Sequence, residues 1–256
     1  MAFHCAESAL LAKVATMCVA FVPAQTLKEK YEILGNFYSV ELAPQCVIEC
    51  RNVLEIVAKP ITASQMRSIP KQKPDAIFVM MNPGSSQPLV EVDYRIRADE
   101  ISELSISLVP TKPDTTQYQV MRLMHCFNLR HVRVLNLSDL RCTKSPLFME
   151  QFKQLETEQL FDAHSIFSSQ RRNELRHQML KYSEVPVVRA WGVSPNLQPL
   201  IERCERGLQP MRHLSGLLKE GTTNKYLHPL PSLQKQQEEW VNRMVKQWNE
   251  QYSVRD

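Results

Sequence analysis

Three short apolar segments, each followed by polar residues or glycine, constrain the fold of this 256-residue chain more than any other feature. They cover residues 76–82, 132–138 and 185–191. Segments with helical spacing separate them: one follows Asp114, a residue type that favours the N-cap position, and two more cover residues 148–161 and 166–182. Strands that alternate with helices are typical of a parallel sheet with crossover helices. The sequence therefore predicts an α/β fold, namely a three-layer sandwich with a mostly parallel central sheet.

The segments on either side of these strands predict further elements. Residues 37–42 and 46–58 are rich in Val, Ile and aromatic side chains, and a short Ala-Pro-Gln segment separates them, so we expect a pair of strands. A helix is expected over residues 232–252, because two tryptophans and a methionine fall on one stripe at helical spacing. Such a stripe favours packing of the helix on the sheet.

The domain organisation follows from length and composition. A hydrophobic content of 43% supports a substantial core, and no repeat or low-complexity segment divides the chain. We predict an N-terminal extension over residues 1–28 and a single α/β domain over residues 29–256. The apolar segment at residues 14–22 lacks the positively charged start of a signal peptide and is too short to span a membrane, so no membrane association is expected.

Charge and cysteine content narrow the class of protein. A net charge of +4 is too small by itself to indicate nucleic-acid binding. A local basic cluster is either a phosphate-binding face or a solvated one, and it consists of Arg122, Arg130, Arg133, Arg141 and Lys144. Seven cysteines without a Cys-x-x-Cys motif indicate reduced thiols in a cytoplasmic protein. Their spacing to histidines matches no standard ligand pattern, so neither a metal nor another cofactor is expected.

Polar or aromatic residues at the ends of the predicted strands, and one histidine in a late loop, are the best candidates for function. They are Asn82, Pro83, Gly84 and Ser85 after the first strand, Asn136 at the end of the second, Trp191 at the end of the third, and His228 in the loop. In open α/β sheets, ligands bind beyond the carboxyl ends of the strands. We therefore expect these residues to line one crevice.

The same residues belong to four motifs. The motifs are Met-Asn-Pro-Gly-Ser at 81–85, Val-Leu-Asn-Leu-Ser-Asp-Leu-Arg at 134–141, Ala-Trp-Gly at 190–192 and His-Pro at 228–229. In this order and with similar intervening lengths, they resemble the uncharacterised "domain of unknown function 1643" family of bacterial and phage proteins. The similarity covers roughly residues 75–230.

The layout is more distantly similar to the uracil-DNA glycosylase superfamily, whose mismatch-specific branch has Gly-Ile-Asn-Pro-Gly as its first motif. This resemblance implies a uracil-DNA glycosylase-like fold with nucleic acid or a nucleotide as partner. It also implies that Asn82 positions the attacking water, that Asn136 reads the base edge, and that His228 stabilises charge on the departing base. Fast members have an aspartate in the first motif, so the asparagine here implies slow hydrolysis or another reaction.

The leading hypothesis is a glycosylase-like protein that binds a nucleobase and hydrolyses its N-glycosidic bond. The alternative is a non-catalytic module on the same fold that binds nucleic acid or a protein. A hydrolase with Ser85 or Ser86 as nucleophile is disfavoured, because the chain has no Gly-x-Ser-x-Gly elbow. Leu230 or Leu233 is a candidate wedge between bases, and either is equally expected in the core.

Overall fold

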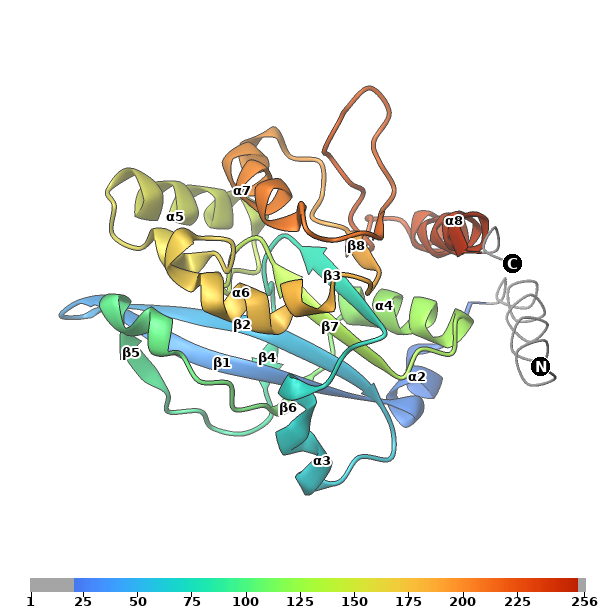
Figure 1. Cartoon of the computed structure of the whole chain (residues 1–256), viewed down its shortest axis with the longest axis horizontal. Coiled ribbons are helices and arrows are strands. Elements are labelled where there is room, and N and C mark those ends of the chain that lie inside the picture. The colour runs from blue at the N-terminus through green and yellow to red at the C-terminus, as the bar shows by residue number, and fades with distance from the viewer. Residues whose placement is uncertain (1–20, 253–256) are drawn as a thin grey trace.

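A nine-stranded mixed sheet forms the centre of the structure, a computed structural model that describes residues 21–252 (Figure 1). The strands are β1 (Tyr31–Ala43), β2 (Cys46–Ala58), β3 (Ala76–Met80), β4 (Gln87–Pro88), β5 (Arg95–Arg97), β6 (Val109–Lys112), β7 (His131–Asn136), β8 (Val187–Arg189) and β9 (Leu214–Ser215). The α-helices are α2 (Ala24–Lys30), α3 (Ala63–Ser68), α4 (Thr115–Cys126), α5 (Ser145–Thr157), α6 (Arg172–Gln178), α7 (Gln198–Leu208) and α8 (Gln234–Tyr252).

The sheet contains an antiparallel and a parallel part. The strand order is β4-β6-β1-β2-β7-β3-β8-β9, and β5 pairs with β1 beside this path. Strands β7, β3, β8 and β9 are parallel to one another, whereas β1 with β2, β2 with β7, β1 with β6 and β4 with β6 are antiparallel. The expectation of a mostly parallel sheet is therefore wrong. The sheet has a large antiparallel part because the long β1–β2 hairpin extends it beyond β7. A tight turn joins the two strands of this hairpin, so they must be antiparallel.

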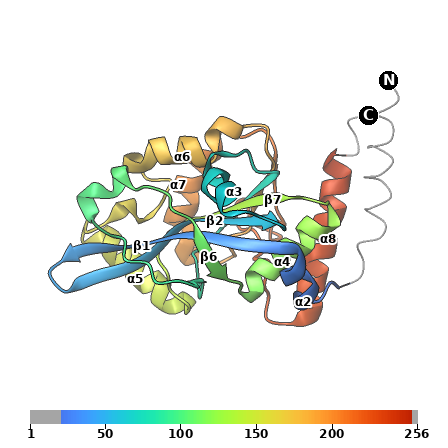
Figure 2. The same cartoon turned by 90° about the horizontal axis from the view of Figure 1, so that it is seen from below.

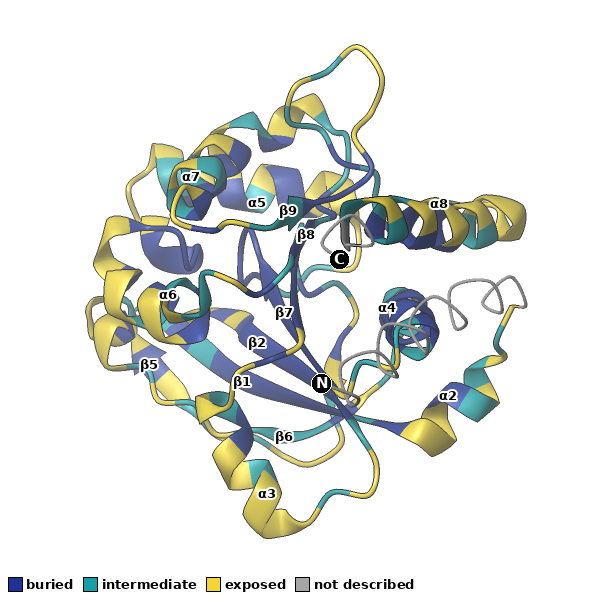
Figure 3. Cartoon of the chain, turned by 45° about the vertical axis from the view of Figure 1, so that its right-hand side comes forward, coloured by how far each residue is buried: buried dark blue, intermediate teal, exposed yellow. Residues whose placement is uncertain are grey.

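Helices cover both faces of the sheet, so the predicted α/β class is confirmed (Figures 2 and 3). Helices α5, α6 and α7 pack on one face through side chains such as Phe148, Leu175 and Ile201. Helices α2, α4 and α8 pack on the other face. The five residues of β3 are all buried between these layers, which explains the uninterrupted apolar segment in the sequence.

Strand β3 is the point at which the chain changes direction across the sheet. The next parallel strand, β7, lies on one side of β3, and β8 lies on the other side. At such a switch point the crossover connections leave in opposite directions, and a crevice opens beyond the carboxyl ends of the strands. Met80, Asn136 and Arg189 are the last residues of these three strands.

Most of the predicted elements are confirmed. The hairpin pair, the helix that follows Asp114 and the C-terminal helix are all present, and the tryptophan stripe of α8 packs on α4 and the sheet. The single helix expected over residues 166–182 is wrong, because only Arg172–Gln178 is α-helical. Hydrogen bonds from the backbone of Phe167 and Ser168 to Ser165 close a local turn there and compete with helix formation.

The N-terminal prediction falls mostly outside the described residues. Residues 1–20 of the expected extension, and most of the apolar segment at 14–22, lie outside them. The expected boundary at residue 28 falls inside α2, and Leu27 of this helix is buried in the core. Within residues 21–252, no helix is long and apolar enough to cross a bilayer.

The prediction of seven reduced thiols is wrong, because the chain contains a disulfide bond. Cys126 is disulfide-bonded, whereas Cys46, Cys50, Cys142 and Cys204 carry free thiols. Among the residues placed by the structure, no group of three or more His, Cys, Asp or Glu side chains is arranged to hold a metal ion.

The packing of α8 predicts a large cost for truncating its buried stripe. Met244 is fully buried, so Met244→Ala should lower the free energy of unfolding by about 2–5 kcal/mol, measured by urea denaturation. Lys246→Ala on the same helix is the control, because the Lys246 side chain is 79% exposed, and its effect should stay within about 0.5 kcal/mol. Equal effects of the two substitutions would contradict the packing of this helix.

Candidate functional site

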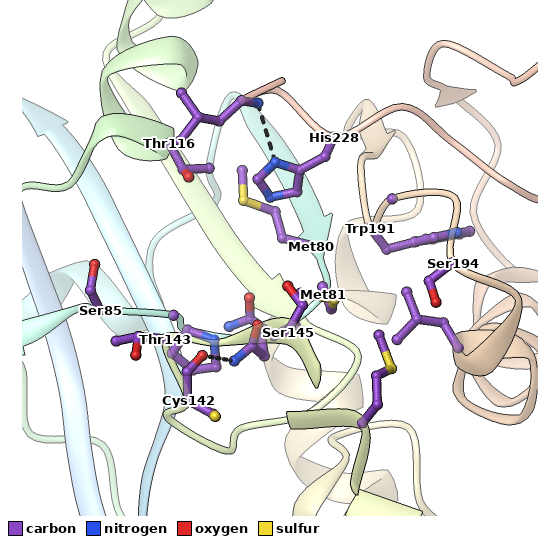
Figure 4. A pocket seen from close by; sticks show the side chains of 18 of the residues that line it. Met80, Met81, Ser85, Thr116, Cys142, Thr143, Ser145, Trp191, Ser194 and His228 are labelled. Carbon is purple, nitrogen blue, oxygen red and sulfur yellow. Dashed lines mark hydrogen bonds between the residues drawn. The ribbon is translucent and has the colours of Figure 1, made fainter. Parts of the chain in front are cut away.

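A pocket of about 990 Å³ lies at the carboxyl ends of β3 and β7 (Figure 4). Its walls also include the residues after β8, the first turn of α4, the start of α5 and the loop that carries His228. The seven candidate residues from the strand ends and the late loop all line this pocket, although they are far apart in the sequence: Asn82, Pro83, Gly84, Ser85, Asn136, Trp191 and His228. In Figure 4, His228 lies beside Met80, and Trp191 with Ser194 stands across the cavity from Ser85 and Thr143.

The loop after β3 fixes the orientation of the Asn82 amide. Its Nδ2 donates to the carbonyl oxygens of Leu140 at 3.1 Å and Cys142 at 2.8 Å. Because a carbonyl oxygen accepts but never donates, the atom of Asn82 that bonds to both carbonyls is the amide nitrogen. The remaining polar atom of the side chain is Oδ1. Asn82 thus offers the pocket an acceptor. Gly84, at φ +61°, turns the loop, and the position of a Cβ there is open space.

Asn136, the last residue of β7, contains the most unusual polar group of the pocket. The residue is fully buried, and neither its Oδ1 nor its Nδ2 has a hydrogen-bond partner among the described residues. Burying a donor or an acceptor without a partner costs about 1–3 kcal/mol. A buried amide with both functions unused is suited to pair with a ligand edge that offers an acceptor beside a donor.

His228 is held as a neutral donor. Its Nδ1 accepts a hydrogen bond from the backbone N–H of Leu230 at 3.2 Å, shown as a dashed line in Figure 4. Since a backbone N–H can only donate, Nδ1 is unprotonated and the proton of the neutral ring resides on Nε2. Burial lowers the pKa of His228 to about 4, which keeps the ring neutral at physiological pH. The ring therefore presents an N–H donor without a charge.

Trp191 forms a rigid wall of the pocket. Its indole Nε1 donates to the Asn224 carbonyl at 3.0 Å, and its ring packs edge-on against Tyr226, with ring centroids 5.3 Å apart. The adjacent Gly192 has a φ of +96° and donates its N–H to the Tyr226 carbonyl at 2.8 Å. These contacts attach the loop after β8 to the segment that leads to His228. The indole thus fixes this wall of the pocket.

The predicted basic cluster is not a continuous surface, because two of its members are buried. Arg133 donates to Glu55 Oε1 at 2.7 Å and to backbone carbonyls, and Arg122 donates to Val22 O and Gln119 Oε1. Both guanidinium groups support the fold, so their assignment to phosphate binding is wrong. Arg141 is half-buried and bonded to Ser86 O and Glu49, while Arg130 and Lys144 are exposed.

The serines do not form a nucleophilic site. Ser85 is exposed at the pocket and Ser86 is buried, and neither hydroxyl bonds to a histidine in the part of the chain that the structure describes. A Ser138–His164–Glu156 chain exists, with Ser138 Oγ 2.9 Å from His164 Nδ1 and Glu156 Oε1 3.3 Å from Nε2. Ser138 is fully buried and does not line the pocket, so this chain packs the core.

Sequence reasoning missed Arg51, which also lines the pocket. It lies within β2, is 2% exposed, and its Nε has no hydrogen-bond partner among residues 21–252. A signal was present, because Arg51 is a charged residue inside a segment that was expected to be an apolar strand. The first turn of α4 was also missed, although Asp114 at its N-cap was identified as the start of a helix.

Comparisons with known proteins give no family assignment: no family model, no curated protein and no solved structure matches this chain. The two resemblances inferred from short motifs therefore stay predictions.

The hydrogen bond to Leu230 predicts a specific tautomer and titration for His228. In imidazole-¹⁵N-labelled protein, the His228 ring should be protonated at Nε2 and unprotonated at Nδ1 at pH 7, with its midpoint near pH 4. A ring proton on Nδ1 at pH 7, or a His228 ring that is charged at that pH, would contradict the donor assignment.

Proposed function

We propose that this protein binds a nucleobase in the pocket and hydrolyses the N-glycosidic bond between the base and its sugar. The observation that carries the proposal is the Asn136 amide, which is fully buried and keeps both its donor and its acceptor unused. The edge of a nucleobase offers an acceptor beside a donor, so it satisfies both atoms at once. Together with Met80 and Trp191 as apolar walls, this favours a planar heterocycle as ligand.

The second support is the placement of a neutral donor in the same pocket. When an N-glycosidic bond breaks, the electron pair of the bond moves to the base and positive charge develops on the sugar. A hydrogen bond from His228 Nε2 to a base oxygen stabilises that negative charge. Because the ring is neutral, the donor remains in place across physiological pH, and a preorganised donor of this kind contributes about 10²–10³ in rate.

Asn82 supports the hydrolytic step and also limits its rate. Its Oδ1 accepts a hydrogen bond from a water molecule, which then attacks the anomeric carbon and forms the new carbon–oxygen bond. An amide oxygen orients water but does not remove its proton as a carboxylate does, so the proton leaves to solvent or to the departing base. We therefore propose slow turnover, in keeping with the asparagine that replaces the aspartate of the fast glycosylases that the motifs resemble.

We propose that the parallel unit β7-β3-β8-β9 with its two helical layers is the uracil-DNA glycosylase-like part of the chain. The antiparallel hairpin β1–β2 is then an addition at its edge. The motifs that carry the resemblance all lie at the carboxyl end of this unit or in the loops beside it.

Three substitutions test the proposed function. We expect Asn136→Ala to abolish binding of the modified-base substrate, whereas His228→Ala should retain binding and lower single-turnover base release by about 10²–10³. Asn82→Ala should likewise lower release more than binding. The measurements are base release from, and affinity for, a panel of modified-base DNA and nucleotides.

Two exposed residues on α6 provide matched controls, Asn173→Ala and His177→Ala, which should leave both quantities unchanged. If all three pocket variants behave like these controls, the proposed function is wrong. Strong, salt-dependent nucleic-acid binding without base release would instead favour the non-catalytic module.

A further inference from the structure

Arg51 is a buried cation without a fixed counter-charge. Its side chain lies against the pocket, and within residues 21–252 it forms neither an ion pair nor a hydrogen bond. Two carboxylates influence it electrostatically, but both are committed elsewhere. Asp114 accepts the Gln117 N–H at 2.9 Å, and Asp139 Oδ2 accepts from Tyr38 at 2.7 Å and Arg171 at 2.6 Å. The second oxygen of Asp139, Oδ1, is buried without a partner.

A β-bulge in β2 places Arg51 and Leu54 on the same face of the strand. In the β1–β2 ladder, Asn36 pairs with Val53 and Phe37 pairs with Arg51, so Asn52 is an extra residue in β2. Cys50 and Val53 consequently share the face covered by α5, α6 and α7, although they are three residues apart. In a regular strand, Arg51 would share the face of Val53. The bulge places it on the opposite face with Leu54, and both residues line the pocket.

The chemistry of Arg51 indicates what it binds. A buried, unpaired charge is costly, and proteins retain one where a ligand supplies the opposite charge. The planar guanidinium matches the oxygens of a phosphate or carboxylate in a bidentate arrangement. Burial lowers the pKa of Arg51 to about 10, so the group remains charged at neutral pH. The first turn of α4, with Thr115 and Thr116, lines the same wall and adds the positive end of its helix dipole.

We propose that the ligand of this pocket is a nucleotide whose phosphate binds Arg51, while its base pairs with Asn136. This inference rests on the proposed function for the base and adds the substrate class. Two sources of this ligand have the same chemistry, a nucleoside with an attached phosphate. The ligand is either a free nucleoside monophosphate or one unit of a nucleic-acid strand. Asp114 lines the same wall and offsets part of the positive charge there. Arg51 itself therefore distinguishes a ligand with a phosphate from one without.

The test compares nucleosides with their 5′-monophosphates and with a short single strand of the same base by calorimetry. In the wild-type protein, the phosphate should tighten binding about 10- to 100-fold relative to the nucleoside. Arg51→Met should remove this difference, because it weakens binding of the monophosphate more than binding of the nucleoside. Arg176→Gln, on an exposed face of α6, removes one positive charge as a control and should preserve the difference.

A second readout separates binding from a structural role. Because Arg51→Met replaces an unpaired buried charge with an apolar side chain, the ligand-free variant should melt at or above the wild-type temperature. It should lose the stabilisation that the monophosphate gives the wild-type protein. A lower melting temperature together with equal loss of nucleoside and nucleotide binding would show a structural role and overturn the proposal.

The remaining outcomes distinguish this inference from the proposed function. Equal affinity of the wild-type protein for nucleoside and nucleotide overturns the phosphate site and leaves base binding intact. A phosphate effect that depends on Arg51 but not on Asn136 overturns the base site instead and supports the anion site alone. Tighter binding of the monophosphate than of the strand identifies a free nucleotide as the source of the phosphate, and the reverse order identifies a strand.

Discussion

The position of β3 between β7 and β8 is the constraint on which the rest of the structure depends. All five residues of β3 are buried, and its backbone groups bond to strands on both sides. The chain must then leave the sheet abruptly, and Asn82 secures the exit by donating to the carbonyls of Leu140 and Cys142. These carbonyls belong to the loop after β7. One side chain therefore connects the loops of two neighbouring strands and brings both to the same pocket.

The buried polar groups of β2 and β7 form two sets. The members of the closed set bond to one another, whereas those of the open set lack such partners among the described residues. At one end of the strand pair, Glu55 bonds to Arg133 at 2.7 Å and to His131 at 2.8 Å, and Arg133 also donates to backbone carbonyls. This set satisfies its charges internally, as a stable core requires. At the other end, Arg51 and Asn136 are equally buried but lack such partners among the described residues. Since the same two strands contain both sets, the open set marks the end at which a ligand binds.

The sequence predicts the strand ends well but not the network around them. Short apolar segments that stop at Asn82 and Asn136 indicate buried strands with polar termini, and the α/β rule then places both ends at one crevice. The antiparallel hairpin was predicted as a pair, yet nothing in its residues indicates that it joins the edge of the parallel unit through β7. The basic cluster failed for a related reason. Charge counts along a chain do not distinguish an exposed arginine from Arg133, whose partners are 45 to 78 residues away.

The bulge at Asn52 shows why the periodicity of the sequence does not predict which residues line the pocket. Counted from Val53, strand periodicity assigns Arg51 to the face of Val53, whereas the extra residue Asn52 puts Arg51 on the face of Leu54. The extra residue is held by side chains from distant segments, since Asn36 donates to Asn52 Oδ1 at 2.9 Å and Asn52 donates to Glu174 at 2.8 Å. Glu174 in turn binds Arg171, which binds Asp139. The common face of Arg51 and Leu54 therefore depends on buried contacts that join β1, β2 and α6.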